Sequence, residues 1–216
     1  MRPADLEPKF ARRTLVTAFA AFLILAPGAA AGQPTTQALT PPPPAFLTCK
    51  AVGEGTLCEG SRTLQHGPML VSDEGGPTFD CGTGANAFQI VDSATVDQHV
   101  IRTYDGGGNL IRREIHEIWR SAQFSNSVTG AAVGYKQSDT ITDVPSVPGD
   151  LDTATETITG NGTNVTVPHD GTIFLQAGRS VYTPDGALDE AGPDAANRYF
   201  IDGDTSVWRQ VCSALS

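Results

Sequence analysis

Short runs of apolar and β-branched residues, separated by turn residues, recur along the chain from Phe88 onward. Gln98–Tyr104 and Leu110–Trp119 flank the loop Asp105-Gly-Gly-Gly-Asn109, and Thr153–Thr159 has threonine at every second position. Val, Ile, Tyr and Thr favour strands, and a Gly-rich loop between two such runs is typical of a β-hairpin. This pattern predicts an antiparallel β fold.

The remaining runs extend the same pattern to the C-terminus, where Val207–Val211 is expected to be the last strand. No long amphipathic helical pattern accompanies the strands. Many short strands joined by tight turns favour a closed barrel or a two-sheet sandwich. Because neighbouring hairpins suggest an up-and-down order, we expect an all-β, antiparallel barrel of about eight strands. The alternative is a two-sheet β-sandwich.

The N-terminal region has the three parts of a secretory signal peptide. Arg12 and Arg13 precede the apolar run Leu15–Ala26, and the small residues Ala29–Ala31 follow it. A basic start, a short apolar core and an A-x-A site predict a signal peptide over residues 1–31. The run is shorter than the roughly 20 apolar residues that span a bilayer. We therefore expect a secreted protein, with an N-terminally anchored, outward-facing protein as the alternative.

A proline-rich segment follows the expected cleavage site. Residues 32–45 are rich in Pro and Thr and include four consecutive prolines at 41–44. Consecutive prolines adopt an extended conformation and cannot join a helix or a central strand. We expect residues 32–45 to be a disordered linker and residues 46–216 to be one β domain, long enough to bury a proper core.

Charge limits the partners of this chain. It has 14 basic and 24 acidic residues, for a net charge of −10. Residues 1–31 hold four basic and two acidic residues, so their removal leaves 10 and 22 and a net charge of −12. Such a protein repels phosphate backbones and anionic lipid surfaces. We expect no nucleic-acid partner and, after signal cleavage, no membrane partner; a small ligand, a glycan or an envelope protein is expected instead.

Four cysteines, an even number, occur in the expected domain: Cys49, Cys58, Cys81 and Cys212. In an exported chain such a set predicts two disulfides, for which three connectivities exist. We prefer Cys49–Cys58, which encloses a Gly-containing loop, together with Cys81–Cys212, which closes a long stretch of chain. The spacing contains no C-x-x-C motif, so a metal or redox site is disfavoured.

Several turn and strand-end motifs resemble those of a loose group of secreted actinobacterial proteins of uncharacterised function. The matching segments are Tyr104–Arg113, Phe124–Gly130, Thr172–Arg179, Val211–Leu215 and Cys81-Gly82. Members of this group have a signal peptide, one β domain and a cysteine near each end of the domain. The resemblance implies the β fold and the Cys81–Cys212 pairing, and it implies no catalytic residue.

Motifs that indicate catalysis or metal binding do not occur in this sequence. There is no G-x-S-x-G nucleophile elbow and no H-E-x-x-H zinc motif. The histidines, His66, His99, His116 and His169, are scattered along the chain. We therefore expect no catalytic residue, no metal ligand and no cofactor.

The hairpin around Gly107 carries the best candidate for a binding group. Symmetric folding places Gln98 opposite His116 and His99 opposite Ile115, so the two imidazoles are expected on opposite faces unless a β-bulge shifts the register. The candidate ligand-binding residues are Arg102, Arg112, Glu114 and His116. They could bind an anionic or hydroxylated ligand at a barrel mouth. The alternative is a solvated face with cross-strand ion pairs.

The function expected from these features is that of a non-enzymatic binding or interaction module. One alternative is an extracellular hydrolase of a small substrate. It requires that two or more of five residues converge within hydrogen-bond reach: His99, His116, Glu114, Ser125 and Asp97. Another alternative is a structural component of the cell envelope.

Overall fold

The computed structural model describes residues 38–74, 78, 80–166, 173–174, 177–191 and 205–216. The chain divides into a unit of residues 1–36 and a unit of residues 37–216, and the description that follows concerns the second unit. The expected signal peptide, residues 1–31, and His169 lie outside the described residues. In the described part of the chain, no helix has the length and apolar character needed to cross a bilayer.

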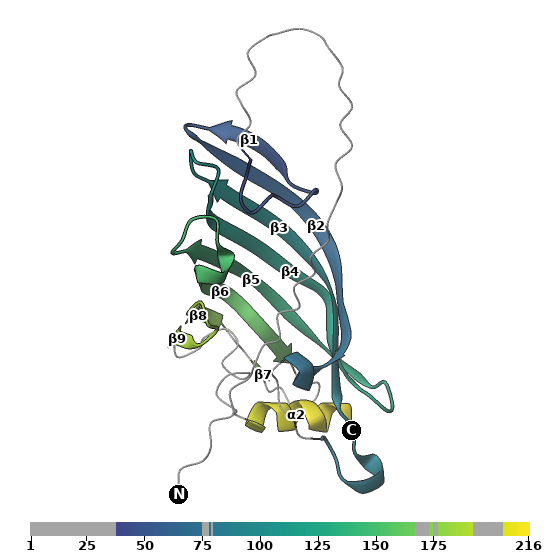
Figure 1. Ribbon diagram of the computed structural model, residues 1–216. Helices are drawn as coiled ribbons and strands as arrows, with labels where there is room; N and C mark the ends of the chain where they lie inside the picture. The colour runs from purple at the N-terminus through teal and green to yellow at the C-terminus, as the bar shows by residue number, and fades with distance from the viewer. Residues whose placement is uncertain (1–37, 75–77, 79, 167–172, 175–176, 192–204) are drawn as a thin grey trace, which may run out of the picture. The chain divides into compact units, whose positions relative to one another are not determined.

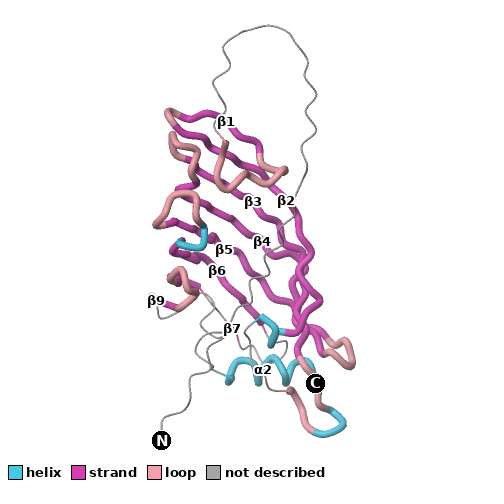
Figure 2. The backbone as a smooth tube through the Cα atoms, viewed as in Figure 1, coloured by secondary structure: helices cyan, strands magenta, loops and turns pink. Residues whose placement is uncertain are grey.

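Strands dominate the described part of the chain, and they form one antiparallel sheet (Figure 1, Figure 2). Its order is β1-β2-β3-β4-β5-β6-β8-β9, so strands that follow one another in the chain pair, except that β8 skips β7 and pairs with β6; β7 also pairs with β6. The strands are β1 (Thr48–Val52), β2 (Gly55–Leu70), β3 (Ile90–Tyr104), β4 (Leu110–Asn126), β5 (Ala132–Pro145), β6 (Ala154–Thr166), β7 (Ile173–Phe174), β8 (Ala177–Tyr182) and β9 (Leu188–Ala191). The all-β, up-and-down fold is confirmed. Over the described residues the sheet is not closed, so closure into a barrel is not confirmed.

Among the described residues, four short helical elements accompany the sheet. They are the 3-10 turns η1 (Val71–Glu74), η2 (Gly84–Asn86) and η3 (Leu151–Thr153) and the α-helix α2 (Thr205–Leu215). The helix corrects the expectation of a last strand at 207–211. Trp208, Val211, Cys212 and Leu215 are all buried, and their spacing of three and four residues places them on one face of a helix. The run 207–211 resembles a strand on its own; Cys212 and Leu215 complete the helical pattern.

Alternate residues of the strands define what we call the inner face of the sheet. On β3 the inner face comprises Ile90, Asp92, Ala94, Val96, Gln98, Val100, Arg102 and Tyr104. On β2 and β4 it comprises the residues that pair directly with these positions. At one end of this face, Trp208, Val211 and Leu215 of α2 pack with Phe124 and Val165 in the larger core cluster. Burial of this apolar surface attaches α2 to the sheet.

The other end of the inner face is covered by residues just before β1. Thr40 N donates to Gly108 O, Leu110 N donates to Thr40 O, and Tyr104 OH donates to Pro41 O at 2.9 Å. Leu47 joins Tyr104 and Leu110 in a second core cluster. Residues 38–45 therefore differ from the disordered linker that was expected up to residue 45. An extended proline segment keeps its carbonyl acceptors, and here Tyr104 and neighbouring backbone groups use them.

Both preferred disulfides are confirmed, and no cysteine is free. Cys49 and Cys58 lie directly opposite each other on β1 and β2, with Cα atoms 4.0 Å apart. Cys81, which lies just before β3, joins Cys212 of α2 across a sequence separation of 131. The second bridge therefore ties the C-terminal helix to the sheet.

Candidate metal centre

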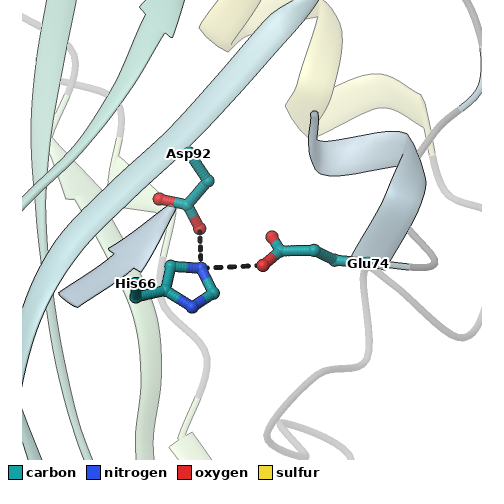
Figure 3. Close-up of side chains that lie close together, drawn as sticks. All are labelled: His66, Glu74 and Asp92. Carbon is teal, nitrogen blue, oxygen red and sulfur yellow. Dashed lines mark ion pairs between the residues drawn. The ribbon is translucent and has the colours of Figure 1, made fainter. Parts of the chain in front are cut away.

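A histidine and two carboxylates converge at one place on the inner face (Figure 3). His66 lies on β2, Glu74 ends η1, and Asp92 lies on β3. One ligand atom from each residue lies within 4.8 Å of the others. His66 Nε2 is 2.7 Å from Glu74 Oε1 and 3.5 Å from Asp92 Oδ2. This is the only group of three or more metal-ligating side chains found among the described residues.

The end of β2 has a bulge that brings these residues together. His66 pairs with Ala94 and Met69 pairs with Asp92, so β2 has one more residue than β3 over this stretch. Gly67, at φ +69, lies so close to β3 that a Cβ there would be 2.2 Å from Asp92 O. Only glycine fits this approach. The 3-10 turn η1 follows β2 directly, and its last residue, Glu74, lies beside His66.

Aromatic residues hold the members of the site in place. Tyr135 OH donates to both oxygens of Asp92, at 2.9 and 3.1 Å. The Tyr135 ring stacks on Phe124 with centroids 4.6 Å apart, and the Trp119 ring meets the His66 imidazole edge-on at 4.6 Å. Metal ligands in proteins are commonly oriented by such a second layer of hydrogen bonds.

The electrostatics of the site are those of two crowded acids. Asp92 is only 5% exposed, and burial raises its pKa. Burial, followed by the neighbouring charge of Asp92, raises the pKa of Glu74 to about 7. Burial and the charge of Asp92 also raise the pKa of the Tyr135 hydroxyl. A cation among these groups would favour both ionised carboxylates.

His66 Nε2 supplies a further observation. This atom is enclosed and makes no well-directed hydrogen bond within the described residues; its contacts are the ion-pair distances to Glu74 Oε1, at 2.7 Å, and to Asp92 Oδ2, at 3.5 Å. A buried polar atom without a hydrogen bond in a native protein needs an explanation, and a bound ion or water is one. An imidazole nitrogen and carboxylate oxygens are the ligand types that zinc accepts. The arrangement can therefore hold a divalent ion with three protein ligands.

A row of polar side chains crosses the inner face beside this site. Arg62 Nε donates to Gln98 Oε1 at 2.7 Å, and Gln98 Nε2 donates to Glu117 Oε1 at 2.5 Å. Trp119 Nε1 donates to the other oxygen of Glu117 at 3.2 Å. Asp139 lies directly opposite Glu117 on β5. Burial, with the charge of Glu117, raises the pKa of Asp139 to about 7.

This shift predicts that Asp139 makes the folded protein less stable as the pH rises. Folded Asp139 keeps its proton up to a pKa of about 7, whereas its ordinary pKa is 3.8. Its contribution is therefore fully present below pH 3.8 and is lost as the pH rises through about 7. Between pH 5 and 8 this titration should lower the free energy of unfolding of the wild type by about 2 kcal/mol. The Asp139→Asn variant has no such group, so its free energy of unfolding should fall by about 2 kcal/mol less over the same pH range. Urea unfolding at several pH values with a chelator present measures it.

The Glu117→Gln variant is the companion measurement. It removes the neighbouring charge but leaves Asp139 buried, so it should reduce the slope of stability against pH only in part. Equal slopes for the wild type and for Asp139→Asn would contradict the assignment.

The four residues expected to bind a ligand together do not form one cluster. A bulge between Thr103 and Tyr104 shifts the hairpin register by one residue, so Arg102 pairs with Arg113 and not with Arg112. Arg102 lies on the inner face and donates to Pro42 O at 3.3 Å. The other three, Arg112, Glu114 and His116, lie on the opposite, outer face.

The same shift corrects the expected placement of the histidines. His99 pairs with His116, so the two imidazoles lie on the same face, with ring centroids 6.2 Å apart. Symmetric folding about Gly107 missed this register because turn geometry, including the bulge, decides how strands pair.

The residues considered for a hydrolase do not assemble. Asp97 accepts from Thr63 and Arg120, and Ser125 Oγ donates to Val91 O at 3.4 Å. His116 Nε2 is 3.8 Å from Glu114 Oε2, which is beyond hydrogen-bond reach. The hydrogen bonds of the described residues therefore connect no pair within this set.

Sequence reasoning missed the His66 site because its members carry no local signature. Glu74 follows His66 by eight residues and Asp92 follows by 26. Neither interval matches the short spacings by which metal ligands are recognised within one helix or one strand. The available signal was Gly67-Pro68 beside a histidine at the end of a strand, which indicates a break in strand pairing.

Comparisons with protein-family models, with curated proteins and with solved structures found no match to this chain. The resemblance to secreted actinobacterial β proteins therefore stays a prediction.

Proposed function

We propose that this protein is an exported binding module that holds a zinc ion between His66, Glu74 and Asp92. The observation that carries this proposal is the convergence, within 4.8 Å, of an enclosed imidazole nitrogen and two carboxylate oxygens. The neighbouring Tyr135 and Trp119 support it, because they orient Asp92 and His66 from outside the site.

The donor set favours zinc over other common ions. Ca²⁺ and Mg²⁺ prefer sites made entirely of oxygen atoms, whereas zinc accepts a mixture of imidazole and carboxylate. Three protein ligands leave one position of a tetrahedral ion for water or for a group of a partner molecule. The small ligand, glycan or envelope protein expected as a partner could supply that group.

Export is part of the proposal. Two disulfides are the bridges expected of a protein that works in an oxidising compartment, and the N-terminal sequence predicts a cleaved signal peptide. We also propose that the sheet closes into a barrel, because an enclosed inner face would shield the ion from bulk water.

Calorimetric titration of the purified protein with zinc chloride tests the metal site. His66→Gln and Asp92→Asn should each lower the affinity of the tightest site at least 100-fold, because each removes one of three ligands. Asp73→Asn is the matched control: it removes a neighbouring acidic group but no ligand, so affinity should change by less than about threefold.

Circular dichroism of each variant establishes that it folds before titration. Wild-type affinity in both folded ligand variants, or no saturable zinc binding by the wild type, would overturn the metal-binding proposal.

A further inference from the structure

Two arginines lie directly opposite each other on the inner face, at the end of the sheet that the residues before β1 cover. Arg102 of β3 pairs with Arg113 of β4, and both residues are partly buried. Side chains opposite each other on antiparallel strands have Cβ atoms about 5 Å apart, and like charges in that arrangement destabilise the sheet. An anion bound by both guanidinium groups would relieve this repulsion.

Arg102 has no acidic partner within the described residues. Its hydrogen bond runs from Nη1 to the neutral acceptor Pro42 O, and at 3.3 Å it is long. Its Nε is enclosed and makes no hydrogen bond to any described residue. An enclosed donor on a charged group is costly to leave without an acceptor, and a bound molecule is one explanation for such a group. Arg102 is therefore a cation that has donors to spare and no counter-ion.

Arg113 has an acidic partner and keeps donors for a second one. Asp143 of β5 lies opposite Arg113 and accepts from its Nε at 2.6 Å. Within the described residues, the two terminal nitrogens of Arg113 donate no hydrogen bond. Arg102, Arg113 and Asp143 together carry one net positive charge, and the next acid in this row, Glu156, lies beyond Asp143 on β6. A carboxylate brings one negative charge and balances the three, whereas a phosphate group brings about 1.5 to 2.

The neighbours of the arginine pair on the inner face are apolar. Val100 and Tyr104, two residues before and after Arg102, are only 3% and 1% exposed and belong to the second core cluster. Ile115 of β4 packs against the same cluster. A hydrogen bond between charged groups is stronger in such surroundings than in water, and a guanidinium can bind both oxygens of a carboxylate. Apolar neighbours also favour a ligand whose carboxylate is attached to a hydrocarbon body.

We propose that Arg102 and Arg113 form a binding site for an organic carboxylate with an apolar body. Arg102 supplies the unpaired charge, and Asp143 is a positioning residue that orients Arg113. The site shares no residue with the candidate metal centre at His66. It therefore gives the binding module a ligand class whether or not that centre holds zinc.

Calorimetric titration with sodium octanoate in the His66→Gln background tests the proposal, because that variant lacks a ligand of the metal centre through which a carboxylate could bind to zinc. In this background Arg102→Gln should weaken octanoate binding by about tenfold or more. Arg102→Lys should weaken it by a smaller factor, because lysine keeps the charge but loses the two-pronged geometry. Arg112→Gln is the matched control. It removes the same charge from the neighbour of Arg113, but on the outer face, where Arg112 pairs with Glu114, so affinity should change by less than about twofold.

Two further probes define the chemistry of the ligand. Octanamide has the same hydrocarbon body without the charge, so it should bind about tenfold more weakly than octanoate or not at all. Inorganic phosphate has the charge without the body and should also bind more weakly. Phosphate binding that is tighter than octanoate binding, or equal affinity for octanamide and octanoate, would overturn the carboxylate assignment.

Nuclear magnetic resonance of the arginine Nε–Hε groups in the wild type gives a readout that does not depend on a folded glutamine variant. The signal of Arg102, identified by its loss in Arg102→Lys, should shift when octanoate is added, and the signal of Arg112 should not. Absence of saturable octanoate binding, unchanged affinity in folded Arg102→Gln, or an unshifted Arg102 signal overturns the proposal. A protein that binds octanoate here but fails the zinc titration would refute only the metal centre.

Discussion

Replacement of Cys81 and Cys212 by alanine is expected to lower the free energy of unfolding by about 4–5 kcal/mol. In the chain-entropy account, a disulfide restricts the unfolded chain more when the loop it closes is longer, and this bridge has a sequence separation of 131. It also attaches α2, whose apolar face closes one end of the core. Urea unfolding followed by circular dichroism measures the loss.

The matched control is the double variant Cys49→Ala and Cys58→Ala. Its bridge has a sequence separation of only 9, so the same account predicts a smaller loss of about 3 kcal/mol. Both bridges bury at least one cysteine, Cys58 at 0% and Cys81 at 2% exposure, so loss of side-chain packing affects both variants. A larger loss from the short-loop variant would contradict the prediction.

Truncation of Trp208 to alanine is expected to cost about 3–5 kcal/mol. Trp208 is only 1% exposed, and its ring meets Phe124 edge-on with centroids 5.2 Å apart. Removal of such a side chain loses its transfer free energy and leaves a cavity that the sheet can fill only partly. Chemical unfolding followed by far-ultraviolet circular dichroism measures the change without relying on tryptophan emission.

Ser213→Ala on the same helix is the control for this prediction. Ser213 is exposed, so its substitution should change stability by less than about 0.5 kcal/mol. A loss below 1 kcal/mol for Trp208→Ala would mean that α2 does not pack on the sheet in solution.

Much of the strand content follows from local sequence. The two arms of the hairpin around Gly107 form strands where the residues predict them, and so does the alternating run Thr153–Thr159 except for Thr153, which ends η3. Both signals are local, since β-branched residues favour extended backbone and glycines allow the turn. The even number of cysteines similarly predicted two bridges, and loop spacing favoured the pairing that the structure has.

Two features of the fold needed the tertiary structure. The C-terminal segment became α2 because a helix can place Trp208, Val211 and Leu215 together against Phe124, and that surface exists only after the sheet forms. The bulge at Thr103 set His99 opposite His116, which no symmetric reading of the loop provides.

The candidate metal centre shows most clearly which features local sequence determines and which only the tertiary structure decides. By itself the sequence determined that the chain forms antiparallel strands joined by tight turns and bridged by two disulfides, because propensity and cysteine count act locally. Only the tertiary structure brought His66, Glu74 and Asp92 within 4.8 Å, since their convergence depends on a bulge, a 3-10 turn and cross-strand register acting together. Contacts between residues far apart in the chain arise from packing, and no local pattern encodes them.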